Sequence, residues 1–191
     1  VYDPAVPMEA ALSLATGGMP LAEKGAAGIF GGRLSPKADL KALHEAETMR
    51  MHGLHPDEVI RDTGWFRAPT DQKWRFEIPD DKMRLSHIPM AEGDKATASV
   101  GSLIDHARLY EAYPSAAHVR MNWTKDSSSP NGSGLFANER VGRPGTDAGW
   151  PAIWVNAPNT KVANSVAGHE LQHFIQRVED FSPGNNPDYY R

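Results

Sequence analysis

Hydrophobic positions follow a helical spacing in the first half of the chain and then change to a period of two. Approximate helical spacing predicts a helix over residues 37–52 and a second, shorter one over residues 55–62. Residues 63–78 read as a β-hairpin, because the second strand alternates polar and apolar positions. The alternation divides that strand into a core side, with Trp74, Phe76 and Ile78, and a water side, with Lys73, Arg75 and Glu77.

The second half of the chain predicts short elements and one long helix. Apolar positions over residues 99–113 favour one helix or two short ones, and residues 118–123 alternate like a strand. A polar loop over 124–134 precedes two further strand candidates, at 134–138 and 152–156. The last helix should span about 161–178, with Asn159 or Thr160 as its N-cap. We therefore expect an α+β fold in which a small antiparallel sheet packs against helices.

The N-terminal region differs in composition from the rest. Residues 1–36 are rich in Ala, Gly and Pro, and paired glycines interrupt each helical candidate there. We interpret 1–36 as an arm that packs on the domain or on a partner, and 37–191 as a single domain.

The composition limits which kinds of binding site and which metal ligands the protein can have. The 191 residues fit one domain of ordinary size, and the net charge of −4 gives no broad basic face for nucleic acid. Because the sequence has no Cys, any metal must be bound by His, Asp or Glu. The chain lacks a run of roughly 18 apolar residues and a basic-then-apolar start, so we expect neither a membrane span nor a signal peptide.

The last predicted helix contains the sequence His-Glu-Leu-Gln-His, which includes His169, Glu170 and His173. Residues four apart share a helical face and lie about 6 Å apart along its axis, so both imidazoles can converge on one ion. Imidazole nitrogens bind zinc at about 2.0–2.1 Å. The carboxylate of Glu170 lies beside them, where it can take a proton from metal-bound water and pass it to a leaving amine. The motif predicts a zinc site with Glu170 as general base.

The same helix has an apolar stripe nearly opposite the imidazoles, formed by Ala167, Leu171, Phe174, Ile175 and Val178.

A catalytic zinc takes three protein ligands and keeps one open position. Glu179 and Asp180 are the local candidates for the third ligand. A straight helix would carry either one roughly 9–10 Å beyond His173, so the helix should end near 176–178 and let the chain turn back. More distant candidates are His87, His106, His118 and Asp105.

Four stretches resemble a domain of the large polyvalent proteins of bacteriophages and prophages. They lie at residues 30–34, at 63–67 with 73–78, at 103–114 and at 169–176, within a span of 28–184. By motif, members of that family look like zincin-type zinc metallopeptidases. The resemblance favours Glu179 over Asp180 as third ligand and places Asp180 where the family usually has Gly. It also implies association with a phage particle, either in the virion or after delivery into the bacterial cytoplasm.

The preferred interpretation is a phage-associated, zinc-dependent metallopeptidase that hydrolyses peptide bonds in a peptide or protein substrate. The strand at 153–156 precedes the motif helix and is expected to pair with an extended substrate. Tyr189 and Tyr190 follow the motif and are candidate oxyanion donors. The competing interpretation is a non-catalytic virion module that contacts other virion proteins and has a vestigial or structural metal site. A weaker third one is a hydrolase acting on a non-peptide substrate.

Overall fold

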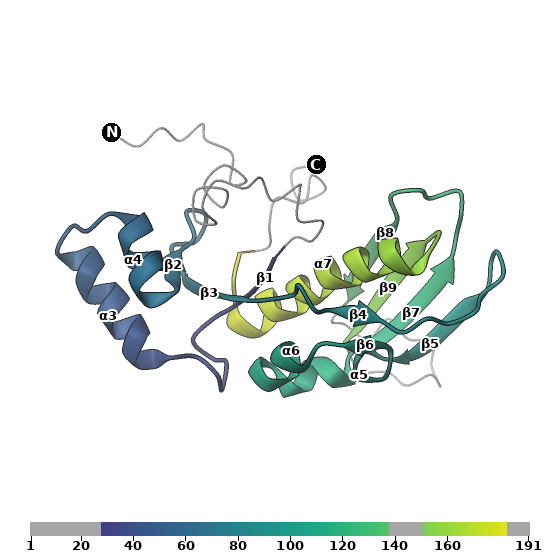
Figure 1. Cartoon of the computed structure of the whole chain (residues 1–191), viewed down its shortest axis with the longest axis horizontal. Helices are drawn as coiled ribbons and strands as arrows, with labels where there is room; N and C mark the ends of the chain where they lie inside the picture. The colour runs from purple at the N-terminus through teal and green to yellow at the C-terminus, as the bar shows by residue number, and fades with distance from the viewer. Residues whose placement is uncertain (1–27, 138–150, 183–191) are drawn as a thin grey trace.

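Short helices and strands alternate along most of the chain, and one long helix follows them. The computed structural model describes residues 28–137 and 151–182 (Figure 1). Its strands are β1 (Ile29–Gly31), β2 (Trp65–Arg67), β3 (Trp74–Ile78), β4 (Arg84–Leu85), β5 (Lys95–Ser99), β6 (Ile104–Asp105), β7 (Arg120–Lys125), β8 (Ser133–Ala137) and β9 (Ala152–Ala157). Its helices are α3 (Leu40–Met51), α4 (Pro56–Thr63), α5 (Val100–Leu103), α6 (Ala107–Ala112), the 3-10 helix η1 (Pro114–His118) and α7 (Thr160–Glu179).

The strands form three small sheets. Antiparallel strands make up the sheet β1-β3-β2 and the pair β4-β6. The largest sheet has the order β5-β7-β9-β8, in which β9 is parallel to β7 and antiparallel to β8. The predicted α+β class is confirmed, although this sheet is mixed rather than purely antiparallel because β9 enters between β7 and β8.

Helix α7 covers one face of the four-stranded sheet and joins it to the rest of the domain. Ile153 and Val155 of β9 and Leu171 and Ile175 of α7 are fully buried in the main core. Burying each such side chain contributes about 1.5–3 kcal/mol. Figure 1 shows α7 reaching from this sheet toward the end of the molecule that carries α3, α4 and β2. The motif helix is therefore held along its length by the core.

The other end of the molecule has a small core of its own. Leu43 and Ala46 of α3 pack with Val59 of α4 and Trp65 of β2. Helix α4 has a capping box and ends at Gly64 in a left-handed conformation with φ of 75°, so the chain can turn directly into β2. The predicted helices and hairpin of this region are confirmed.

One prediction for the first half is wrong, and some residues assigned to the arm lie on the domain. Residues 29–31, assigned to the arm, form β1 and pair with β3, and Ile29 is fully buried. This pairing is the contact expected of an arm that packs on the domain, and residues 1–27 of the arm lie outside the described residues. Arg75, predicted to face water, is buried. Its charge is neutralised by Asp71, an interaction that strand periodicity cannot reveal.

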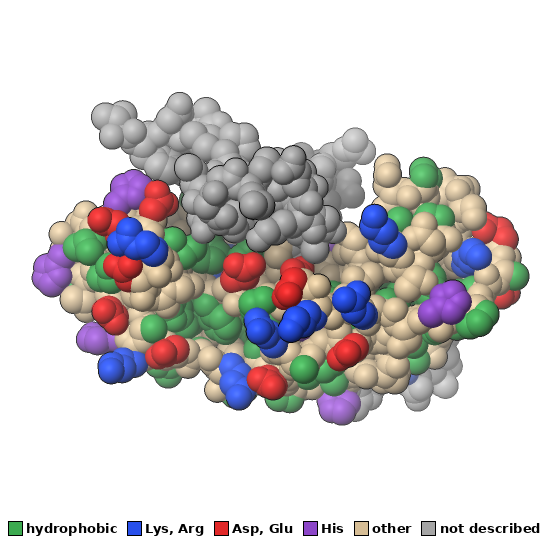
Figure 2. Space-filling model, in the orientation of Figure 1, with side chains coloured by type: hydrophobic (Ala, Val, Ile, Leu, Met, Phe, Trp, Pro, Cys, Tyr) green, Lys and Arg blue, Asp and Glu red, His purple; other side chains and the backbone are tan. Residues whose placement is uncertain are grey.

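On the face drawn in Figure 2, basic and acidic side chains are interspersed, so neither sign of charge dominates that face. Within residues 28–137 and 151–182, no helix is both long enough and apolar enough to cross a membrane.

Candidate metal centre

The motif lies on a well-formed helix. Asn159 caps α7, because its side chain accepts a hydrogen bond from the Val162 N–H at 3.0 Å. The predicted apolar stripe faces the core, with Val178 only partly buried. The helix does not end at residues 176–178 as expected: it continues through Glu179, and Asp180 caps it in a left-handed conformation with φ of 54°. The side chains that follow His173 therefore stay on a straight helix.

The two imidazoles of the motif converge. Nε2 of His169 lies 3.2 Å from Nε2 of His173, with the rings nearly perpendicular. Two nitrogens that share a tetrahedral zinc at about 2.0–2.1 Å lie about 3.3 Å apart, so the observed spacing suits a shared ion. Burial lowers the pKa of His169, and His173 lowers it further. Both effects favour the neutral imidazole that metal binding requires.

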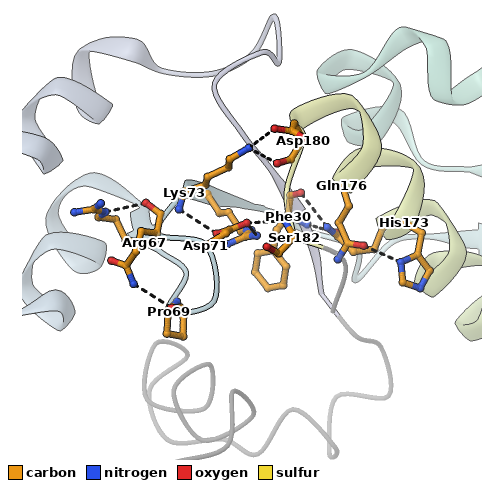
Figure 3. A network of polar contacts seen from close by, with 12 residues as sticks. Phe30, Arg67, Pro69, Asp71, Lys73, His173, Gln176, Asp180 and Ser182 are labelled. Carbon is orange, nitrogen blue, oxygen red and sulfur yellow. Dashed lines mark hydrogen bonds and ion pairs between the residues drawn. The ribbon is translucent and has the colours of Figure 1, made fainter. Parts of the chain in front are cut away.

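The second ring nitrogen of His173 is fixed by its own helix. Nδ1 of His173 lies 2.7 Å from Oε1 of Gln176, one helical turn further on (Figure 3). Because an amide oxygen only accepts hydrogen bonds, Nδ1 carries the proton and Nε2 keeps its lone pair. That lone pair is directed toward His169.

Glu170 is buried beside the edge strand of the sheet. Only 4% of it is exposed, and a side chain on Gly134 of β8 would collide with its carboxylate. Burial raises the pKa of Glu170, although His173 and a hydrogen bond from the Phe136 N–H act in the opposite direction. The net effect is a raised pKa, which is the direction expected of a carboxyl group that accepts and then releases a proton.

The structure does not bring Glu179 to the imidazoles. At 1.5 Å per residue it lies about 15 Å along the axis from His169 and about 9 Å from His173. Its carboxylate is buried and accepts hydrogen bonds from the Tyr113 hydroxyl at 2.6 Å and the Leu34 N–H at 3.1 Å. Gly32 packs so closely that a Cβ there would lie 2.6 Å from Oε2 of Glu179. In this arrangement Glu179 fastens residues 32–34 to the helix.

The other third-ligand candidates are also elsewhere. The alternative, Asp180, pairs with Lys73. His106 is buried, and its Nδ1 caps α6 by accepting from the Leu109 N–H. Among the residues that the structure describes, no three His, Asp or Glu side chains are grouped to hold a metal ion, so His87, His118 and Asp105 do not complete the site either. Tyr189 and Tyr190 lie outside the described residues.

The turn between β2 and β3 holds the chain where α7 ends. Lys73 bonds to the Asp180 carboxylate and its backbone oxygen, and Asp71 accepts from the Ser182 N–H at 2.7 Å (Figure 3). Asp71 also forms a buried ion pair with Arg75. Burial would raise the pKa of Asp71, but its hydrogen bonds and the Arg75 charge outweigh burial and lower it. We call this group, Asp71, Lys73 and Arg75 with residues 180–182, the clasp.

Sequence reasoning missed several residues that shape the site. Gln172 bonds to the backbone of Phe30 in β1, with Oε1 accepting from the N–H at 2.7 Å. Gln176 could have been found, since residues three apart on a helix are neighbours. Gly134 and Tyr113 reach the site from distant parts of the chain, so local spacing gave no signal for them.

Comparison with known families supports part of the resemblance. Residues 28–86 match the family model described as "Large polyvalent protein associated domain 23". The matched segment runs from β1 to β4 and contains two of the four resembling stretches, but not the motif helix. No curated protein and no solved structure matches the chain. The finding supports a relation to large polyvalent proteins and leaves the zincin-like assignment to the motif itself.

Proposed function

We propose that this protein is a zinc-dependent metallopeptidase of a phage-associated polyvalent protein. The observation that carries the proposal is the convergence of His169 and His173, whose Nε2 atoms lie 3.2 Å apart beside the buried carboxylate of Glu170. Two imidazoles that can share an ion, with a carboxyl group beside them for proton transfer, are the residues of the H-E-x-x-H motif of zinc metallohydrolases. The phage association rests on the resemblance to polyvalent proteins.

In the proposed hydrolysis, the histidines and the two glutamates of α7 would have separate roles. His169 and His173 would bind the ion through Nε2. A bound zinc supplies Lewis acidity, which polarises a carbonyl group and acidifies water. Glu170 would accept a proton from the attacking water and donate it to the departing amine, a double role that its raised pKa supports. Glu179 would act as a structural anchor rather than as third ligand.

The expected substrate strand needs revision. β9 has β7 on one side and β8 on the other, so it cannot pair with a peptide. Within the described residues, β8 is one of the two edge strands of this sheet, and Gly134 of β8 packs against Glu170. An extended peptide that added to β8 would lie beside the proposed base. We therefore assign substrate pairing to β8 instead of β9.

The experiment is a comparison of zinc-loaded wild type with Glu170→Gln on fluorescein-labelled casein. We expect cleavage by the wild type and at least a 100-fold slower rate for the variant, because general acid–base catalysis contributes about 10²–10⁴-fold. Zinc content and the circular-dichroism spectrum should not change. No cleavage by the zinc-loaded wild type, or equal cleavage by both proteins, contradicts the proposal.

One observation favours a second candidate, a non-catalytic virion module. The described residues supply only two grouped metal donors, and the predicted third is committed to Tyr113 and Leu34. In such a module the imidazole pair would bind metal for stability or not at all. Glu170→Gln would then leave every function of the virion unchanged.

A further inference from the structure

We propose that Gln176 is a positioning residue that sets the tautomer of His173 and so prepares its Nε2 atom to bind a metal ion. The contact is short, 2.7 Å between Oε1 of Gln176 and Nδ1 of His173. It lies on the side of the ring opposite the nitrogen that faces His169. The effect of Gln176 on metal binding rests on the proposed function, whereas its effect on the tautomer of His173 does not.

The two imidazoles, His169 and His173, differ in which nitrogen carries the proton, and Gln176 determines this difference. In the metal-free chain the two Nε2 atoms at 3.2 Å can share one hydrogen bond, which one ring donates and the other accepts. Gln176 makes His173 the acceptor, because Nδ1 already carries its proton. His169 must then be the donor. To bind an ion, His169 would have to move its proton from Nε2 to Nδ1, whereas His173 would need no rearrangement.

The clasp holds Gln176 in place. The backbone oxygen of Gln176 accepts from the N–H groups of Asp180 and Phe181, the latter at 2.8 Å. Lys73 and Asp71 in turn fix residues 180–182. Figure 3 shows the contacts of Lys73 and Asp71 with Asp180 and Ser182 and, at the other end, the contact of Gln176 with the His173 ring. The segment that matches the polyvalent family model thus supports the last turn of the motif helix.

The test uses imidazole ¹⁵N spectra of the metal-free chain, recorded on the alkaline side where the ¹⁵N shifts no longer change with pH. We expect His173 to carry its proton on Nδ1 in the wild type and in Gln176→Glu, whose carboxylate also accepts. In Gln176→Leu the proton should move largely to Nε2. Zinc affinity, measured by competition with a chelating dye, should fall by about 10–100-fold in Gln176→Leu and be restored in Gln176→Glu.

Gln172→Leu is the matched control, since Gln172 lies on the same helix but bonds to Phe30. It should unfold more easily, with the His173 tautomer and zinc affinity unchanged. An unchanged tautomer in Gln176→Leu overturns the inference, as does the same shift in Gln172→Leu. If no variant binds zinc but Gln176→Leu alone shifts the tautomer, the positioning role stands and the proposed function fails.

Discussion

At the residue scale, the two glutamates of α7 have different surroundings. Glu170 interacts electrostatically with His173 and touches β8, whereas Glu179 is anchored to Leu34 and Tyr113. Sequence spacing predicted that His169 and His173 converge on one face of the helix, because i and i+4 geometry is a local property of a helix. It could not place Glu179, since the donors that hold it come from positions 66 and 145 residues away.

Glu179→Ala should destabilise the fold without removing metal. The substitution leaves the Tyr113 hydroxyl and the Leu34 N–H without their acceptor, which costs about 2–4 kcal/mol in unfolding free energy. Urea denaturation measures this change. Glu45→Ala, on the exposed side of α3, is the control and should change it by less than about 0.5 kcal/mol. Normal stability with loss of zinc would instead make Glu179 the third ligand.

At the element scale, β8 and the clasp hold the motif helix from two sides. The position of β8 at the sheet edge depends on how the strands are ordered in space and not on the sequence of β8 itself. The sequence therefore pointed to β9, which precedes the motif helix, as the strand that pairs with substrate. Similarly, Arg75 stands at a strand position that the polar–apolar alternation assigns to water. Its guanidinium is instead stacked over Phe181, 4.1 Å from the ring centre. Such positions depend on which segment packs against the strand.

Gly134→Ala tests the contact between β8 and the helix. A methyl group there collides with the Glu170 carboxylate and lies 2.7 Å from Val166, so the carboxylate must rotate away from the Phe136 N–H. We expect a loss of about 1–3 kcal/mol in unfolding free energy and, in the zinc-loaded protein, slower casein cleavage. Leu135→Ala, at an exposed neighbouring position, should leave the unfolding free energy unchanged. Equal stability of Gly134→Ala and wild type would show that β8 does not constrain Glu170.

Asp71→Ala tests the clasp. The change leaves the Arg75 guanidinium, 9% exposed, without its partner, and it frees the Ser182 N–H. Removing one member of a buried ion pair costs about 3–5 kcal/mol. Asp62→Ala breaks the exposed pair with Arg61 and should have almost no effect on chemical denaturation. Comparable effects of the two substitutions would contradict the structural role of the clasp.

At the scale of the whole molecule, the segment that matches the polyvalent family supports a helix that lies outside the match. Phe30, Leu34 and the clasp residues all contact α7 or the residues that follow it. The α+β class and most element positions could be predicted, because they follow from local periodicity and turn residues. The sheet order, the pairing of β1 with β3 and the surroundings of Glu179 could not, since they depend on contacts between distant parts of the chain.

The pH dependence of folding should reflect His106. Burial lowers its pKa below the ordinary value of 6.5, although the neighbouring Asp105 acts in the opposite direction. The unfolded chain therefore takes up a proton that the folded chain resists, so the unfolding free energy is highest above pH 6.5 and decreases as the pH falls below it. His106→Asn keeps a cap for α6 and should reduce this slope in urea titrations at several pH values. An unchanged slope would exclude His106 as its source.

The most direct test of the account is the zinc content of the purified protein after equilibration with a zinc buffer, measured by elemental analysis. The account predicts about one zinc ion per chain in the wild type and none in His169→Ala/His173→Ala, with Glu179→Ala retaining the ion. A wild type that holds no zinc when zinc is supplied would contradict the metal centre, and with it the proposed peptidase.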